Sequence, residues 1–336
     1  MKMLYPSIGQ PLLNLIKDAS HVMIASHKRP DADCAYSSMA LDLILRSMGK
    51  KTMMVNEGPF NRSEVLPCAA SFYSSPTEDF LASDPLVVIV DCSDAQRVGT
   101  AFGAADLSKL KVVILDHHSS HDPDFGDAVY RIPESVSTTL IIYQLSKALG
   151  VTISKECAQY ILRGFITDSG GFRFIDSKQN ETFFLIAELT NAYGLCVSYE
   201  YEYIFSRQSM AVNRFLSKLM DRSRFFHEGR LAISFEYESD AAEYEGNPAP
   251  TDDYFARMFL VQGVQAVVML RYLEPNRTNL SFRSSHRSGI DVGAIASEFP
   301  GKFNGGGHVH ASGADVAMDM ETALNAVVNS MNGCFN

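Results

Sequence analysis

The segment HVMIASHKRPDAD at residues 21–33 decides the fold, because an apolar run ends there in polar side chains. The proline in this segment prevents a helix from continuing, so His27, Asp31 and Asp33 are expected on a tight loop. An H-x-x-x-D-x-D spacing on such a loop can fold around a cation. Asp33 is equally explained as the cap of a helix that starts near Cys34.

Two further apolar runs end in the same way. Asp91 follows residues 86–90, and the triplet DHH at 116–118 follows residues 111–115. In α/β sheets, ligands bind at the carboxyl ends of the parallel strands. Acidic and imidazole groups that repeatedly follow buried runs therefore indicate a metal site. Taken singly, Asp91 is also typical of a turn, and paired histidines are common in surface loops.

The first half of the chain alternates β-branched runs with amphipathic stretches, which predicts an α/β fold with a mainly parallel sheet flanked by helices. The pattern is helical over residues 137–193. The predicted strands and helices of the second half are residues 230–237, 265–273 and 278–283, and residues 252–262, 291–299 and 320–331. We expect a first domain at 1–193, a helical connector at 194–228 and a smaller α/β domain at 229–336.

The composition indicates a globular protein, with 336 residues of which 46% are hydrophobic and 20% charged. A formal net charge of −10 argues against a long polyanionic partner, since proteins that bind many phosphates usually carry a basic face. The six cysteines include no C-x-x-C pair, which is typical of reduced thiols in the cytoplasm. Residues 1–10 hold no apolar leader, so we expect a soluble cytoplasmic protein without a membrane partner.

Four carboxylates, those of Asp31, Asp33, Asp91 and Asp168, are candidates for one crevice. Alone, they would repel one another and raise their pKa values. Two divalent cations would balance four negative charges, and histidine nitrogens would complete a mixed oxygen and nitrogen set that suits Mn²⁺. We therefore expect a dinuclear centre. Asp168 follows a predicted helix at 157–165, where its neighbouring glycines are also typical of a helix end.

Two segments of the second half carry the parts of an anion cradle. Arg283, Ser284 and Ser285 offer a guanidinium group and hydroxyls, and the Gly-Gly-Gly-His run at 305–308 offers unhindered N–H groups. A glycine triplet by itself is more often a plain loop.

Together these motifs resemble the DHH phosphoesterase superfamily, and the segments at 283–285 and 305–308 resemble its DHH-associated C-terminal domain. The branch that the chain resembles is the standalone bacterial one of short-oligoribonucleotide hydrolases (nanoRNases) that also act as 3′-phosphoadenosine 5′-phosphate phosphatases. The resemblance covers residues 16–193 and 229–330. It implies an active site in the cleft between the two domains.

Carried over position by position, the resemblance implies two metal-ligand sets that share one bridging carboxylate. The first set is His27, Asp31 and Asp91, and the second is Asp33, Asp91, His117 and Asp168. The ions would be two Mn²⁺ per site, with Mg²⁺ or Co²⁺ as substitutes.

The resemblance also implies that His118 faces the scissile phosphate, while Asp116 could orient an imidazole from behind. The residues implied to bind the substrate phosphate are Arg283, Ser284, Gly306, Gly307 and His308. Ala32 and Tyr36 stand where this branch often has glycines. Neither is a ligand, but Tyr36 could reshape the pocket and alter substrate choice.

We therefore expect a phosphohydrolase in which a water shared by two ions attacks phosphorus in line, with short oligoribonucleotides or bisphosphorylated adenosine as substrates. Hydrolysis of cyclic or linear dinucleotides, or of inorganic pyrophosphate or polyphosphate, stays open because such family members share the motifs. A nucleotide-binding regulator without chemistry would predict a broken ligand set, whereas every expected ligand is present. The sequence is compatible with a homo-oligomer.

Overall fold

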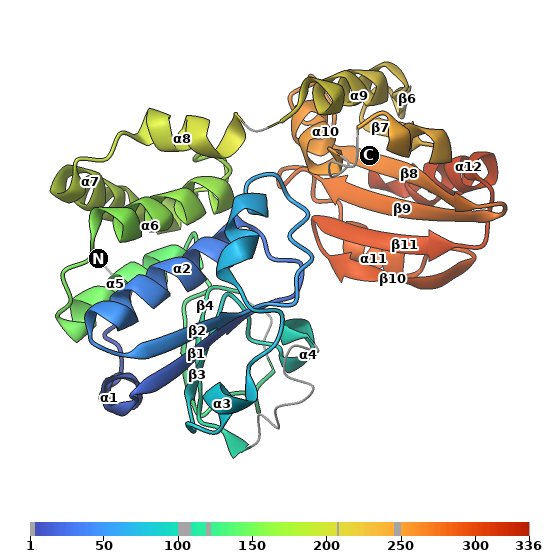
Figure 1. The fold of residues 1–336 in the computed structure, drawn as a ribbon. Helices are drawn as coiled ribbons and strands as arrows, with labels where there is room; N and C mark the ends of the chain where they lie inside the picture. Colours follow the sequence, from blue (N-terminus) through green and yellow to red (C-terminus); the bar gives the residue numbers. More distant parts are fainter. Residues whose placement is uncertain (1–3, 100–108, 119–121, 207, 245–249, 336) are drawn as a thin grey trace. The chain divides into compact units, whose positions relative to one another are not determined.

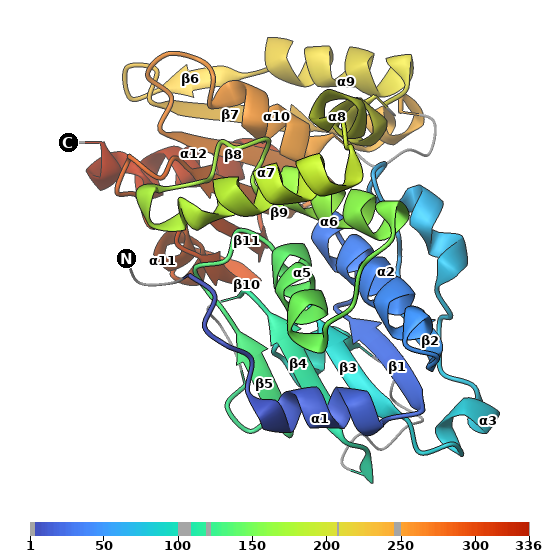
Figure 2. The same cartoon turned by 90° about the vertical axis from the view of Figure 1, so that its left-hand side faces the viewer.

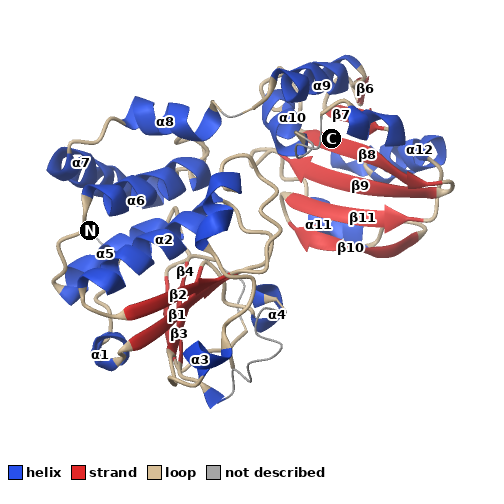
Figure 3. Ribbon diagram, in the orientation of Figure 1, coloured by secondary structure: helices blue, strands red, loops and turns tan. Residues whose placement is uncertain are grey.

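The computed structural model describes residues 4–99, 109–118, 122–206, 208–244 and 250–335. The chain divides into two compact units, Met1–Arg207 and Gln208–Asn336 (Figure 1). Each unit is a sheet with helices packed against it, as Figure 3 shows by colour. The expected α/β class is therefore confirmed.

The first unit contains a five-stranded sheet in the order β2-β1-β3-β4-β5, and every pair in it is parallel. Its strands are β1 (His21–Ser26), β2 (Lys51–Val55), β3 (Leu86–Val90), β4 (Val112–Asp116) and β5 (Ala128–Arg131). The strands β1, β3 and β4 were expected from the apolar runs that end in candidate ligands. Strand β5 was not expected, because it is a short edge strand with only one buried side chain.

The long helices of the first unit pack on one face of this sheet (Figure 2). They are α1 (Gln10–Asp18), α2 (Ala32–Ser47), α5 (Thr138–Leu149), α6 (Lys155–Asp168) and α7 (Glu181–Tyr193), followed by α8 (Val197–Phe205). The other face packs against side chains of two short helices, α3 (Glu78–Leu81) and α4 (Ala95–Val98). Because both faces are covered, the central strand β3 is apolar and buried at every position.

Two helices have ends that differ from the prediction. In each case a predicted site residue takes a different position in the helix from the one expected. Helix α2 begins at Ala32, so its N-cap is Asp31, whose carboxylate accepts from the Cys34 N–H at 3.0 Å. The cap role considered for Asp33 is therefore wrong. Helix α6 continues to Asp168 instead of ending at 165, which makes Asp168 its last helical residue.

The second unit contains a mixed six-stranded sheet in the order β10-β11-β9-β8-β7-β6, in which only β7 and β8 are parallel. Its strands are β6 (Arg224–Phe226), β7 (Leu231–Glu236), β8 (Ala266–Glu274), β9 (Arg277–Ser284), β10 (Lys302–His308) and β11 (Ala311–Val316). Helices α11 (Val292–Ser297) and α12 (Met320–Ser330) cover one face. Helices α9 (Met210–Asp221) and α10 (Thr251–Met258) cover the other.

The segment expected as a helical connector, residues 194–228, is shared between the units. Helix α8 belongs to the first unit, whereas α9 and β6 belong to the second. Strand β6 corrects the prediction, because no strand was expected there. Its three residues are too few to show an alternating hydrophobic pattern. The functional domain limits at 193 and 228 stay predictions, because the two units are defined by packing alone. Among the described residues, no helix is both long and apolar enough to cross a membrane.

The glycine triplet at 305–307 lies in strand β10, not in a plain loop, and it pairs with β11. All three glycines have positive φ angles, between 146° and 159°. A Cβ on Gly307 would lie 2.6 Å from the carbonyl oxygen of Ala311, whereas a Cβ on Gly306 would meet only the Ser297 hydroxyl at 3.8 Å. The close pairing of the two strands therefore requires glycine at 307.

We predict that Gly307→Ala lowers the free energy of unfolding more than Gly306→Ala does. Both substitutions place a side chain at an unfavourable φ, which costs about 1–3 kcal/mol, and only Gly307→Ala adds a backbone clash. Urea unfolding of the two variants beside the parent protein checks this. Equal losses would show that the strand pairing does not require glycine at 307.

Candidate metal centre

The register of the parallel sheet brings three strand ends to one edge. Ser26 at the end of β1 pairs with Val90 of β3, and Val90 pairs with Leu115 of β4. The residues that follow these positions are therefore neighbours in space, although they are far apart in the sequence. They are His27, Asp91 and the triplet Asp116, His117 and His118.

Asp91 lies at the middle of this edge and faces both neighbours. Its φ angle is +57°, which turns the chain immediately after β3 and is uncommon for a residue other than glycine. One carboxylate oxygen, Oδ2, lies 3.4 Å from Nε2 of His27, and the other, Oδ1, lies 3.5 Å from Nε2 of His117. The carboxylate is buried and spans the space between two imidazoles, as a bridging ligand would.

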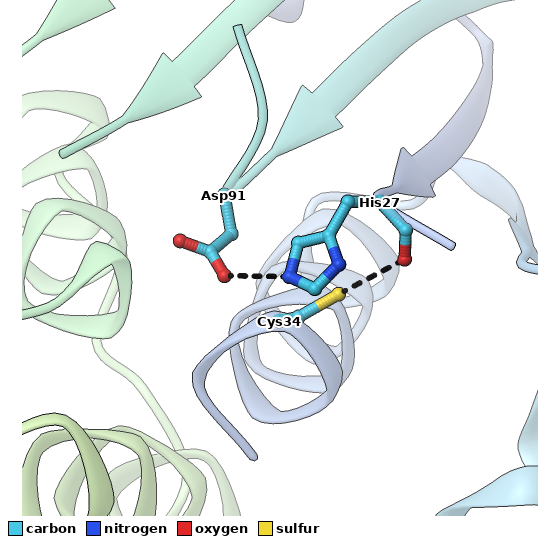
Figure 4. Close-up of side chains that lie close together, drawn as sticks. All are labelled: His27, Cys34 and Asp91. Carbon is cyan, nitrogen blue, oxygen red and sulfur yellow. Dashed lines mark hydrogen bonds and ion pairs between the residues drawn. The ribbon is translucent and has the colours of Figure 1, made fainter. Parts of the chain in front are cut away.

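His27 presents a nitrogen that has no hydrogen-bond partner among the described residues. Its Nδ1 donates to the carbonyl oxygen of Lys28 at 2.9 Å, which leaves Nε2 to face other groups. This Nε2 is buried and faces a carboxylate oxygen of Asp91 at 3.4 Å (Figure 4). It also faces a carboxylate oxygen of Asp31 at 3.9 Å. A ring nitrogen that faces two carboxylates is stabilised by a proton or by a metal ion, so this group fits a metal ion.

A second group lies on the other side of Asp91. Nδ1 of His117 contacts the carbonyl oxygen of Ser135 at 3.1 Å, which again leaves Nε2 to face carboxylates. These are Asp168 at 3.2 Å and Asp33 at 3.9 Å. One donor atom from each of these three residues lies within 4.8 Å of the others, so they could also hold an ion.

Asp33 is held in place by the start of α5. Its two carboxylate oxygens accept from the backbone N–H groups of Thr138 at 2.6 Å and Thr139 at 3.0 Å. A helix N-terminus stabilises negative charge through its unpaired N–H groups and its dipole. The side chain of Thr138 also donates to Oδ1 of Asp91 at 2.9 Å. A single helix end therefore orients two candidate ligands.

Burial and mutual repulsion shift the pKa values at this centre. Burial raises the pKa of Asp33, and the charges of Asp168 and Asp91 raise it further. Burial also raises the pKa of Asp168 to about 6, although His117 opposes the rise. Burial would raise the pKa of Asp91, but the neighbouring histidines lower it by more, so the pKa of Asp91 is lowered overall. For His117, burial lowers the pKa, but Asp168 and its neighbours raise it well above the usual value. The centre therefore favours bound positive charge.

The carboxylate of Asp116 accepts hydrogen bonds that hold His117 and His118 in place. Its Oδ1 accepts from Nδ1 of His118 at 2.8 Å and from the backbone N–H of His117 at 2.8 Å. Its Oδ2 accepts from the Ser93 hydroxyl at 2.5 Å. Arg131 donates to the carbonyl oxygen of His118 at 3.0 Å. These contacts fix the His118 ring by its Nδ1 and leave its Nε2 for other interactions.

The expected phosphate-binding residues lie in the second unit. Arg283 at the end of β9 contacts Asp252 at 3.4 Å and lies over the ring of Phe255. Ser284 is buried, and its hydroxyl donates to the carbonyl oxygen of Ile290 at 2.8 Å, which occupies its proton. Gly306, Gly307 and His308 belong to β10, and the side chain of His308 lies outside the described part of the structure. Their role in binding substrate stays a prediction.

Sequence reasoning missed several residues that support or join the centre: Cys34, Ser93, Ser135, Thr138 and Thr139. The Ser-Val-Ser-Thr-Thr run at 135–139, just before a helix, is a usable signal because such residues are typical of helix N-termini. Cys34 carries no comparable signal, because no spacing rule links a lone thiol to a carboxylate site.

The fold and the site define an α/β protein with candidate metal ligands at the carboxyl ends of parallel strands. Residues 21–165 match the model of the DHH family, N-terminal domain. The chain carries a DHH family domain, and the resemblance inferred from its motifs is confirmed.

One similar protein matches over nearly the whole chain. It is the bifunctional oligoribonuclease and PAP phosphatase NrnA of Thermus thermophilus, which is 29% identical over 92% of this chain and 89% of its own length. A probable manganese-dependent inorganic pyrophosphatase of Streptococcus mutans is 28% identical over 45% of this chain and 48% of its own. An exopolyphosphatase-related protein from Bacteroides fragilis shares the fold, with a TM-score of 0.83, 23% identity and coverage of 97% and 96%.

We predict that Mn²⁺ stabilises the folded protein. At a hundred times its Kd, an ion that binds only the folded state adds about 2.7 kcal/mol to the free energy of unfolding. Asp91→Asn should lose most of this gain, because it removes the negative charge of the bridging carboxylate. Thermal unfolding with Mn²⁺ and with a chelator measures the effect. The exposed Asp79→Asn serves as the matched control and should keep the full gain. An unchanged gain in Asp91→Asn would contradict the assignment of Asp91.

Proposed function

We propose that the chain is a metal-dependent phosphohydrolase that cleaves short oligoribonucleotides and 3′-phosphoadenosine 5′-phosphate. The observation that carries this proposal is the placement of Asp91, whose two oxygens face the Nε2 atoms of two different histidines. The full-length similarity to a protein named as an oligoribonuclease and PAP phosphatase supports the substrate class.

Two divalent ions, Mn²⁺ or its substitutes Mg²⁺ and Co²⁺, would supply the charge that activates a water and neutralises the phosphoryl oxygens. The residues proposed to hold them are His27, Asp31 and Asp91 for one ion, and Asp33, Asp91, His117 and Asp168 for the other. The Nδ1 contacts of the two histidines with backbone carbonyls fix both rings in the orientation that binding needs.

His118 is proposed to contact the phosphoryl group. Its ring is about one-third exposed, and its Nδ1 is held by Asp116. Nε2 is therefore the ring atom left for substrate. An N–H at this position could donate to a phosphoryl oxygen as negative charge develops there. Asp116 acts here by positioning His118.

Short substrates fit the charge of the protein better than long ones. With a net charge of −10, the chain offers little attraction to a long polyanion. We place the substrate phosphate at Arg283, with the backbone of Gly306 and Gly307 and with His308 as further donors. The described cysteines form no disulfide, and four are buried thiols, which supports a reducing, cytoplasmic location.

Hydrolysis of inorganic pyrophosphate is the second candidate. The similarity to the pyrophosphatase spans 45% of this chain, whereas the similarity to the oligoribonuclease spans 92% and includes the second unit. This difference favours the nucleotide substrates. Dinucleotide hydrolysis uses the same proposed ligands and differs only in how the substrate is held. A regulator without chemistry is disfavoured, because the complete ligand set is present.

We predict that the Mn²⁺-loaded protein hydrolyses oligomers of two to five nucleotides faster than long RNA. Few phosphates are contacted, so the rate on short oligomers should depend only weakly on salt. A panel of a diribonucleotide, a five-mer, long RNA, bisphosphoadenosine, a cyclic dinucleotide and pyrophosphate measures this. Asp91→Asn should lower kcat by several orders of magnitude on the preferred substrate with the fold retained. Processive degradation of long RNA, or pyrophosphate as the best substrate, would contradict the proposal.

We predict opposite kinetic effects for Arg283→Ala and His118→Ala. Arg283 would bind a phosphate equally in the ground and transition states, so its loss should raise KM and lower kcat/KM by roughly ten- to a hundredfold. His118 would act mainly in the transition state, so its loss should lower kcat. Arg277→Ala, at the opposite end of β9, is the control and should change neither. If Arg283→Ala leaves KM unchanged on every substrate, the second unit does not hold the phosphate.

A further inference from the structure

Cys34 places a thiol beside the first candidate metal group. It lies in the first turn of α2, and its side chain is completely buried. Its Sγ, a ring nitrogen of His27 and a carboxylate oxygen of Asp91 all lie within 4.8 Å of one another (Figure 4). The group therefore offers sulfur, nitrogen and oxygen donors, a set that the metal-ligand pattern of the sequence did not include.

The Cys34 thiol makes a long hydrogen bond to the backbone. Its Sγ contacts the carbonyl oxygen of His27 at 3.7 Å, a long contact for a weak donor. Asp31 is more constrained, because one of its oxygens caps α2 through the Cys34 N–H. An ion with donors at 2.0–2.3 Å has donor-to-donor distances of about 3.3–3.8 Å. Binding would therefore bring Sγ closer to the other two donors than the 4.8 Å within which they now lie.

The Nε2 atom of His27 is the independent sign of a ligand here. Nε2 is buried, lacks a hydrogen-bond partner among the described residues and faces the carboxylates of Asp31 and Asp91. The second group, Asp33, His117 and Asp168, has oxygen and nitrogen donors only. Among the described residues, a sulfur atom lies near the first group and not near the second. The two metal positions therefore differ in the chemical softness of their donors.

We propose that Sγ of Cys34 is a ligand of the ion held by His27 and Asp91, and that this position favours a thiophilic divalent metal such as zinc, cobalt or cadmium over Mg²⁺. On binding, the S–H bond breaks, a sulfur–metal bond forms and one proton leaves to bulk water. The oxygen-rich second position would keep a preference for Mn²⁺ or Mg²⁺. This inference rests on the proposed metal centre.

Cobalt absorption tests the proposal without an activity assay. A thiolate bound to Co²⁺ gives a near-ultraviolet charge-transfer band, whereas nitrogen and oxygen ligands give only visible bands. The parent for the test is the metal-free full chain with Cys196→Ser, which removes the exposed thiol. Co²⁺ is added to this parent, to its Cys34→Ser variant and to its Cys157→Ala variant. Cys157 is the matched control, because it is a buried thiol that also contacts a backbone carbonyl.

We expect the band in the parent and in Cys157→Ala, and its loss in Cys34→Ser with the visible bands retained. Cd²⁺ titration should show at least a roughly tenfold weaker affinity in Cys34→Ser, with a smaller change for Mn²⁺. Visible bands without a charge-transfer band in the parent would overturn the role of Cys34 and leave the metal centre standing. A parent that binds no Co²⁺ at all would overturn both. Circular dichroism confirms that each variant is folded.

Discussion

The structure of the first unit depends on one electrostatic constraint: several carboxylates are buried together at the edge of a parallel sheet and need positive charge. Asp91 is central to it, because the chain turns at a left-handed φ to direct both carboxylate oxygens towards imidazoles. In this state the histidines supply the compensation, and the raised pKa values of Asp33 and Asp168 reflect their burial first and the remaining repulsion second. Divalent ions would relieve the repulsion more fully.

The surrounding elements hold the ligands in place before any ion binds. The N-terminus of α5 fixes Asp33 and Asp91 through Thr138, and backbone carbonyls fix the rings of His27 and His117. Preorganisation of this kind lowers the entropic cost of binding a metal ion, because the side chains are already restricted to one conformation. The same covered sheet that buries the carboxylates also supplies the rigid strand ends on which they stand.

The strand ends were predictable because apolar runs mark buried parallel strands, and polar residues mark where these runs stop. The predicted ligands therefore come together as expected, although their metal roles stay predictions. Contacts across long sequence separations were not predictable. The Thr138 N–H reaches Asp33 from 105 positions away, and nothing local in either segment reveals the pair. The triplet at 305–307 was not predicted as a strand, because glycine-rich segments favour loops unless a partner strand approaches closely.

Electron paramagnetic resonance of the Mn²⁺-loaded protein tests the central claim most directly, because two Mn²⁺ ions bridged by one carboxylate are exchange-coupled. The account predicts a coupled dimanganese spectrum for the parent protein. It also predicts a spectrum of uncoupled Mn²⁺ for a folded Asp91→Asn variant. A parent spectrum of isolated Mn²⁺ at full loading, or coupling that survives the loss of the Asp91 carboxylate, would contradict the account.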